Sequence, residues 1–225
     1  MNKTDAVRIH KSVLSTPEKK LLAWIARRLP ASITSDHMTA LGLFGSVLSG
    51  TGYVLTNWGK GFLWLASFGF IVNWFGDSLD GTLARIRNKQ RPIYGFYLDH
   101  NIDALTTLII ALGAGISPFV SLDVALLVMA GYFMLSIFTY INTYLEGKFT
   151  ITYNGFGPTE FRIGVILVNT LFFFLPTKNP PIALFNMSIK LFDLISLVVA
   201  LILIVIYVIG FLTSLKKYSR IDPPK

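Results

Sequence analysis

The sequence predicts an all-α polytopic membrane protein, with six transmembrane helices and an N-terminal amphipathic helix at the membrane interface. The first observation behind this prediction is composition. Of the 225 residues, 53% are hydrophobic and only 14% are charged, and the mean hydropathy is +0.59. Soluble domains are typically about 25% charged, so this chain has too few charges to cover a soluble domain of its size. The composition excludes a disordered chain and an ordinary soluble enzyme, and the lack of cysteine excludes a disulfide scaffold.

The second observation is the number of long apolar segments. A helix needs about 20 mostly apolar residues to cross a bilayer. Six segments qualify, at about 33–55, 61–85, 94–116, 122–145, 160–176 and 189–213. Turn-forming residues such as Gly, Pro and Asn separate them. We expect one six-helix transmembrane catalytic domain over 33–213, between a cytoplasmic N-terminal segment, 1–32, and a cytoplasmic tail, 214–225.

The N-terminal segment contains a candidate amphipathic helix. Ser15 and Glu18 have the spacing of a capping box, which predicts a helix start. The apolar residues that follow lie largely on one face, with basic residues outside it. The apolar set is Leu21, Leu22, Trp24, Ile25 and Leu29, and the basic set is Lys19, Lys20, Arg27 and Arg28. This pattern favours a helix in the cytoplasmic headgroup region, and the alternative is a helix that packs on other cytoplasmic loops.

The basic residues predict the orientation. All but three of the 20 Lys and Arg residues lie before the first span, after the second, around the loop after the fourth, or in the tail. The remaining three, Lys60, Lys178 and Lys190, lie on the other side. Cytoplasmic loops carry an excess of Lys and Arg, so both termini are expected in the cytoplasm, which requires an even number of spans. The net charge of +8 is therefore a topology signal, and we expect the lipid bilayer, and no nucleic acid, as a partner.

The first span carries small residues at four-residue spacing. Gly42, Ser46 and Gly50 share one helix face, which lets another helix backbone approach closely. We expect this face to be a packing surface within the chain.

Four aspartates lie in the second and third spans, and ionisable groups inside a membrane usually mark a functional site. Helical spacing places Asp77, Asp80, Gly81, Ala84 and Arg85 on one face, and Gly95, Asp99 and Asp103 on another. A short loop joins the two spans, so we expect them to be antiparallel neighbours. The helical rise then places the carboxylates at similar depth, about 12 Å from the loop.

Four carboxylates in one partly dry pocket need compensating cations. Oxygen ligands suit Mg²⁺ or Mn²⁺, and two ions held by shared carboxylates are a common device for phosphoryl displacement. Gly81 and Ala84 leave room for a bulky group, and Arg85 can bind phosphate. Three alternatives remain: polar contacts between helices, a cation transporter, and a membrane prenyltransferase. The transporter would not need Gly and Arg on the aspartate face, and prenyltransferase clusters usually lie on helices distant in sequence.

These residues resemble the signature of the CDP-alcohol phosphotransferase (CDP-alcohol phosphatidyltransferase) family. That signature is D-x2-D-G-x2-A-R followed by G-x3-D-x3-D, and every fixed position from Asp77 to Asp103 matches. Nine residues separate Arg85 from Gly95, one more than the commonest spacing. The resemblance implies that Asp77, Asp80 and Asp99 bind the metals, and that Asp103 is both a metal ligand and the catalytic base.

The resemblance also implies six spans, a surface helix, cytoplasmic termini and active site, and a homodimer. Many family members carry P-N-x-x-T near the cytidine. Here Thr39 matches, whereas Ser35 and Asp36 depart from the pattern. We therefore expect Thr39, Gly81, Ala84 and Arg85 near the CDP moiety, with contact from Asp36 in doubt.

The expected activity is transfer of a phosphatidyl group from CDP-diacylglycerol to a small polar alcohol, with release of CMP. The alternative within the family uses CDP-choline or CDP-ethanolamine as donor and diacylglycerol as acceptor. Candidate acceptor contacts are Glu160, Arg162 and Arg91. Glu160 and Arg162 could instead pair with each other, and topology alone explains Arg91. His100 is expected to pack or hydrogen-bond rather than bind metal, and the small size favours a prokaryotic plasma membrane.

Overall fold

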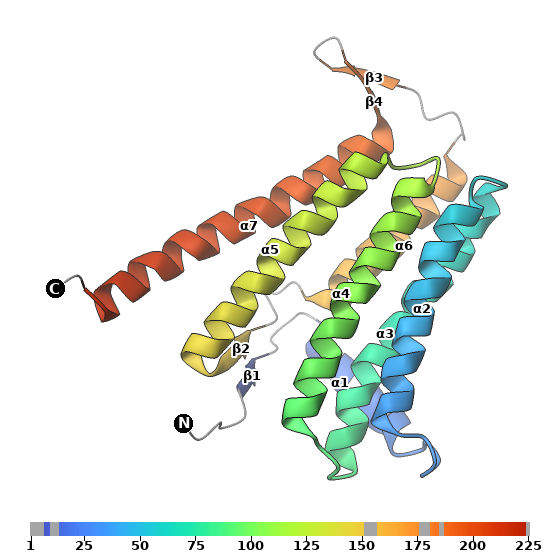
Figure 1. The fold of residues 1–225 in the computed structure, drawn as a ribbon. Helices are drawn as coiled ribbons and strands as arrows, with labels where there is room; N and C mark the ends of the chain where they lie inside the picture. The colour runs from blue at the N-terminus through green and yellow to red at the C-terminus, as the bar shows by residue number, and fades with distance from the viewer. Residues whose placement is uncertain (1–6, 10–13, 151–156, 176–180, 185–186, 224–225) are drawn as a thin grey trace.

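A computed structural model of the chain shows long helices that run side by side (Figure 1). The structure describes residues 7–9, 14–150, 157–175, 181–184 and 187–223. Its helices are α1 (Ser15–Ala26), α2 (Ser35–Leu55), the short 3₁₀ helix η1 (Lys60–Phe62), α3 (Leu63–Ile86), α4 (Pro92–Ile116), α5 (Leu122–Glu146), α6 (Pro158–Phe174) and α7 (Leu191–Ile221). Its strands are β1 (Val7–Ile9), β2 (Lys148–Thr150), β3 (Pro181–Leu184) and β4 (Met187–Lys190).

The fold is helical, as predicted, with two short strand pairs that the sequence analysis did not anticipate. β1 pairs in parallel with β2, and β3 pairs antiparallel with β4. Both pairs lie outside the helices, at opposite ends of the molecule (Figure 1). They do not change the architecture, because three- and four-residue strands connect segments rather than build a layer.

Four stretches in the described part of the chain are long and apolar enough to cross a membrane: α2, η1 with α3, α5 and α7. The protein is therefore a multi-pass membrane protein. The predicted count of six also requires α4 and α6. α4 has 25 residues but carries the polar aspartate motif in its first half, and α6 has only 17 residues, about 26 Å of helix. The long helices alternate in direction from α2 to α7 (Figure 1), and six spans stay a prediction.

α2 and α3 pack backbone against backbone through small residues. A Cβ atom built on Gly45 would lie 2.2 Å from the backbone nitrogen of Asn73, and one on Gly76 would lie 2.3 Å from that of Gly42. On the same side of α2, Ser46 is fully buried. The predicted packing role of the Gly42, Ser46 and Gly50 face is thus confirmed, and only glycine permits this approach.

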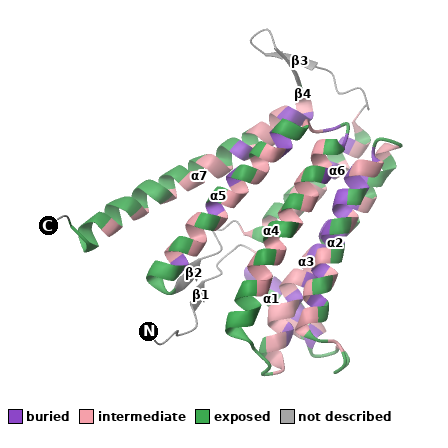
Figure 2. Ribbon diagram, in the orientation of Figure 1, coloured by how far each residue is buried: buried purple, intermediate pink, exposed green. Residues whose placement is uncertain are grey.

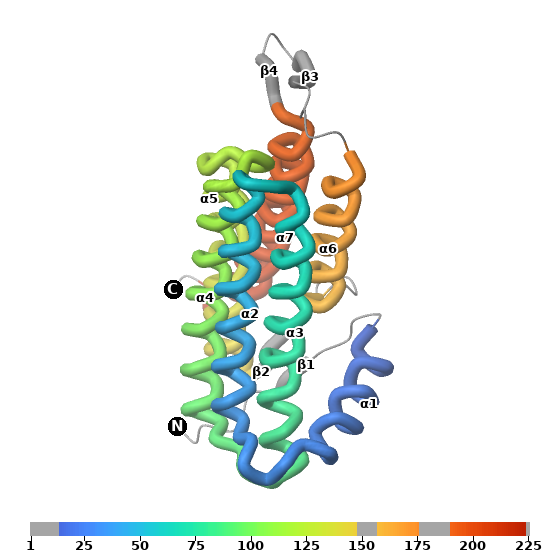
Figure 3. The backbone as a smooth tube through the Cα atoms, turned by 90° about the vertical axis from the view of Figure 1, so that its right-hand side faces the viewer, coloured from blue at the N-terminus to red at the C-terminus, as the bar shows by residue number. Residues whose placement is uncertain are grey.

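α2 also packs against α4, so it lies between the two helices that carry the aspartates (Figure 3). A Cβ on Gly113 of α4 would lie 2.5 Å from the Cα of Gly50. α3 and α4 are antiparallel, as expected, and their aspartates meet, but each of the two helices packs mainly on α2. The physical reason is that the small residues of α2 accept both backbones, which leaves the aspartate side chains to occupy the space between α3 and α4.

α1 packs on the bundle through one face and exposes another. Leu22 and Ala26 are buried against Met38 and against Leu79 and Leu83 of α3. The predicted capping box is wrong, because the N-cap residue is Leu14 and no side chain caps the helix. Leu21 and Trp24 are exposed, so the interfacial position of α1 stays a prediction that these two residues support.

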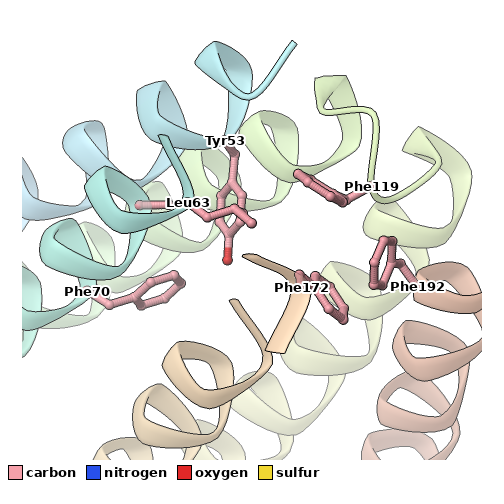
Figure 4. Packing of buried hydrophobic residues seen from close by; sticks show 7 residues of the cluster. Tyr53, Leu63, Phe70, Phe119, Phe172 and Phe192 are labelled. Carbon is pink, nitrogen blue, oxygen red and sulfur yellow. The ribbon is translucent and has the colours of Figure 1, made fainter. Parts of the chain in front are cut away.

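Aromatic residues close the end of the bundle away from the aspartates (Figure 4). The cluster comprises Tyr53, Leu63, Ala66, Phe70, Phe119, Phe172 and Phe192. The Tyr53 hydroxyl donates to Asn169 Oδ1 of α6 at 3.0 Å, and the Asn169 amide donates to Ser67 of α3 at 3.2 Å. α7, by contrast, is exposed along most of its length (Figure 2), as a helix that faces lipid would be.

Candidate active site

α3 and α4 bring their aspartates together at one point. Carboxylate oxygens of Asp77, Asp99 and Asp103 all lie within 4.8 Å of one another. Asp80 joins them in lining a small cavity of about 10 Å³. The rest of the lining comes from Thr39 and Gly42 of α2, Asn73 of α3, and Ile102 and Thr106 of α4. The cavity therefore lies where the three helices meet.

The donor set of this cavity fits a divalent cation. Its charged ligands are carboxylate oxygens, which Mg²⁺ and Mn²⁺ prefer, and no thiolate or thioether competes for a softer metal. A volume of about 10 Å³ admits roughly one water-sized group. Unscreened, the carboxylates would repel one another strongly at this separation. The residues present therefore fit a metal site.

Thr39 is tied to the acidic cluster. Its hydroxyl donates to Asp80 Oδ2 at 2.8 Å, while the other carboxylate oxygen of Asp80 accepts from the backbone N–H of Gly81. Ser35, one turn earlier on α2, donates to the backbone carbonyl of Asp80 at 2.8 Å. Sequence analysis expected Thr39 near the nucleotide, and the structure gives it a partner in the acidic site. The anchoring role of Ser35 was missed, although its four-residue spacing from Thr39 places both on one face.

Arg85 lies over Gly81 on its own helix. A Cβ on Gly81 would lie 3.2 Å from Nη1 of Arg85, and Nη2 donates to Thr82 at 3.0 Å. The guanidinium thus occupies space that the glycine leaves, and Arg85 is exposed. Ala84, next to it, is half-buried.

Two other basic residues between α3 and α4, Arg87 and Arg91, have partners within the chain. Arg91 pairs with Asp36, and its guanidinium lies 4.0 Å from the ring centroid of Tyr94. Arg87 donates to the backbone carbonyls of Ile33, Leu29 and Pro30 and so fastens the α1–α2 connection to the end of α3. This role of Arg87 is not predictable from local sequence, because it depends on carbonyls more than 50 residues away.

Arg162 of α6 reaches the acidic cluster. Its Nη2 lies 2.7 Å from Asp77 Oδ2, and its side chain is only 13% exposed. Glu160 accepts backbone N–H groups instead, from Gly157 at 3.0 Å and from Leu14 at 3.0 Å. The sequence left open whether Glu160 and Arg162 pair with each other or contact the acceptor. The ion pair that the structure shows for Arg162 is with Asp77.

α5 supplies an aromatic wall that sequence analysis did not assign to the site. The His100 ring contacts both Phe96 and Tyr140 in tilted arrangements, with ring centroids 4.0 Å and 4.6 Å away, in keeping with a packing role. Tyr132 lies two turns before Tyr140 on α5. The eight-residue spacing of the two tyrosines places them on one face of α5, which was the available signal.

Comparison with known proteins decides the family. Residues 28–215 match the profile of the CDP-alcohol phosphatidyltransferase family. The chain belongs to this family. An archaetidylinositol phosphate synthase from Pyrococcus horikoshii is 31% identical over 140 residues, which are 62% of this chain and 70% of the relative. Cholinephosphotransferase 1 from Bos taurus and from Homo sapiens are 25% and 24% identical over 168 residues, 71% of this chain but only 41% of each relative.

Membership of this family makes the protein a metal-dependent CDP-alcohol phosphotransferase of phospholipid synthesis. The three-aspartate cluster is consistent with the metal site that the family requires. The cation transporter and the membrane prenyltransferase are accordingly set aside.

Proposed function

We propose that this CDP-alcohol phosphotransferase transfers a phosphatidyl-type group from CDP-diacylglycerol to a small polar alcohol and releases CMP. The observation that carries the proposal is the convergence of Asp77, Asp99 and Asp103, with Arg162 beside them. The relative matched over 70% of its length is named for synthesis of archaetidylinositol phosphate, a lipid with a phosphorylated polyol headgroup. That name supports a lipid-linked donor and a hydrophilic acceptor here.

In this proposal the aspartates hold the metal and Asp103 is also the base. Asp77, Asp80, Asp99 and Asp103 would hold a pair of Mg²⁺ or Mn²⁺ ions, and bound cations would supply positive charge beside the phosphate oxygens.

Proton transfer and phosphate binding fall to the chain's own side chains. Asp103 takes the proton of the acceptor hydroxyl as its oxygen forms a bond to the β-phosphorus, and the bond from that phosphorus to CMP breaks. Arg85 stabilises charge on the phosphates from α3, and Arg162 does so from α6. Gly81 and Ala84 line the approach of the CDP moiety, with Thr39 holding Asp80.

A single assay tests the proposed activity. Purified protein is incubated with Mn²⁺, radiolabelled CDP-diacylglycerol and a panel of alcohols, and CMP release is measured. We expect release with at least one alcohol and a return to background when a chelator removes the metal. Absence of CMP release with every CDP-alcohol tested would contradict the proposal.

The second candidate reverses the roles of lipid and headgroup. The cholinephosphotransferases align with 71% of this chain, which supports CDP-choline or CDP-ethanolamine as donor and diacylglycerol as acceptor. The same assay separates the two candidates, since only the second candidate predicts CMP release from CDP-choline or CDP-ethanolamine when diacylglycerol is added.

The proposed topology has six spans, with both termini and the active site in the cytoplasm of a prokaryotic cell. The alternating helix directions (Figure 1) and the bias of basic residues support it. A reporter active only in the cytoplasm, fused after Lys225, is expected to be active. Activity of an extracytoplasmic reporter at the same position would overturn the topology. A homodimer is also proposed, and cross-linking in membranes would detect it.

A further inference from the structure

α1 carries a buried carboxylate that the reaction does not use. Glu18 is only 9% exposed and lies on the face of α1 that packs against the bundle. Glutamate is almost never buried to this extent unless it is paired or hydrogen-bonded, because burying the charge is costly. Among the described residues Oε2 of Glu18 has no hydrogen-bond partner, so the hydrogen bonds that hold the carboxylate are made by Oε1. The burial of Glu18 must therefore be explained by its contacts.

One oxygen of Glu18 joins three helices. Oε1 accepts from Trp74 Nε1 at 2.8 Å and from Ser78 Oγ at 3.3 Å, both on α3. It also accepts from Thr159 Oγ1 at 2.8 Å, on the first turn of α6. Trp74 and Ser78 are one turn apart and flank Asp77 in sequence, and Thr159 precedes Arg162 by one turn. The donors to Glu18 therefore lie within one helical turn of Asp77 and Arg162, the ion pair at the acidic site.

A second contact joins α1 to α6, and here the carboxylate belongs to α6 and the donor to the start of α1. Glu160 of α6 accepts the backbone N–H of Leu14, just before α1, as well as that of Gly157. The three helices form a closed set of contacts: α1 with α3 and α6 at Glu18, and α3 with α6 at the Asp77–Arg162 pair. Figure 3 shows α1 beside the lower part of α3, close to where α6 begins. The part of α6 that contacts Glu18 through Thr159 therefore lies one turn from Arg162, whose guanidinium pairs with Asp77.

We propose that Glu18 is a positioning residue of the acidic site, which holds the first turn of α6 on α3 so that Arg162 stays on Asp77. The part of this inference that concerns turnover rests on the proposed function. It assigns to the surface helix a direct part in the geometry of the site.

The inference predicts opposite effects on metal binding and on turnover. With Glu18→Ala, the first turn of α6 loses the hydrogen bond that Thr159 donates to Glu18, and Arg162 is expected to move away from Asp77. Removing a positive charge from beside a cation site strengthens cation binding, and at this range the Coulomb term supports an effect of about tenfold. Turnover falls, because Arg162 no longer lies where phosphate charge develops. A general loss of folding would not tighten metal binding.

The experiment measures Mn²⁺ binding by calorimetry on the full chain in lipid nanodiscs, without substrate, together with kcat and KM for CMP release. Glu18→Ala is expected to tighten Mn²⁺ binding about tenfold and to lower kcat. Thr159→Val keeps the side-chain shape and removes only the α6 donor. It is expected to tighten Mn²⁺ binding and to lower kcat as well, each by a smaller factor than Glu18→Ala. Glu18→Gln keeps an acceptor oxygen for the three donors and is expected to remain close to the unmodified protein.

A double-mutant cycle shows whether Glu18 acts through Arg162. Arg162→Gln alone is expected to tighten Mn²⁺ binding, and adding Glu18→Ala to it is expected to change the affinity by less than about twofold. The matched control is Glu146→Ala, which removes another interhelical carboxylate, one that accepts from Tyr218 and pairs with Lys217 far from the site. It is expected to leave Mn²⁺ affinity unchanged.

Unchanged or weaker Mn²⁺ binding in both Glu18→Ala and Thr159→Val would overturn the inference, as would full additivity with Arg162→Gln. Thr159→Val keeps the test decisive if Glu18→Ala does not fold. Mn²⁺ binding is scored without substrate, so the result is distinguishable from failure of the proposed function, in which the unmodified protein would bind Mn²⁺ but release no CMP.

Discussion

Asp103→Asn is expected to lower turnover by about 10²–10⁴-fold, the range for loss of a general base. The amide has nearly the same shape as the carboxylate but cannot take the proton of the acceptor hydroxyl. The backbone carbonyl of Asp103, which accepts from Thr107 at 2.8 Å, is untouched by the substitution, so α4 should remain intact. CMP release in the radiolabel assay measures the loss, and calorimetry measures the nucleotide binding that should persist.

The control for Asp103→Asn is Asp123→Asn. It makes the same chemical change on an exposed residue in the first turn of α5. It is expected to leave turnover within about twofold, because exposed substitutions away from such sites have small effects. Full activity of Asp103→Asn would show that another group is the base. Loss of Mn²⁺ binding together with turnover would show that the residue matters first as a metal ligand.

Gly45→Ala is expected to destabilise the bundle by about 3 kcal/mol or more, the upper part of the range for overpacked cores. The new Cβ would lie 2.2 Å from the backbone nitrogen of Asn73, so α2 and α3 must separate. Separation would break the 2.9 Å hydrogen bond from the Asn73 amide to the Gly42 carbonyl and draw Thr39 away from Asp80. Thermal unfolding in detergent measures the stability, and CMP release measures the accompanying loss of activity.

Gly164→Ala on α6 is the matched control for this prediction. A Cβ there would meet no atom within 4 Å. Because alanine favours a helix by about 0.5–1 kcal/mol over glycine, Tm should stay the same or rise. Equal unfolding temperatures for the two variants would refute the backbone packing of α2 on α3.

Much of the site could be predicted because its motif is local. Asp77 and Asp80 share one helix face, as do Asp99 and Asp103, and helical periodicity alone determines this. The loop between α3 and α4 is short, so the two faces had to come to similar depth. The small-residue face of α2 was predictable for the same reason.

Other features followed from packing and were not predictable. Glu18 and Ser15 have capping-box spacing, but the Glu18 carboxylate turns instead toward Trp74, Ser78 and Thr159. The pairing of Arg91 with Asp36 and that of β1 with β2 also depend on partners distant in sequence. A local pattern cannot distinguish a cap from a tertiary contact, because the same side chain can make either.

The sequence by itself determined the membrane class, the family signature and the faces that carry the four aspartates. These properties depend on composition and on residues within two or three helical turns. Only the tertiary structure decided that α2 separates α3 from α4, that Arg162 meets Asp77 across 85 residues, and that Glu18 joins α1 to both helices. Such contacts depend on how closely whole helices approach one another rather than on spacing along any one helix. Between α2 and its neighbours α3 and α4, that approach is set by backbone packing at glycines.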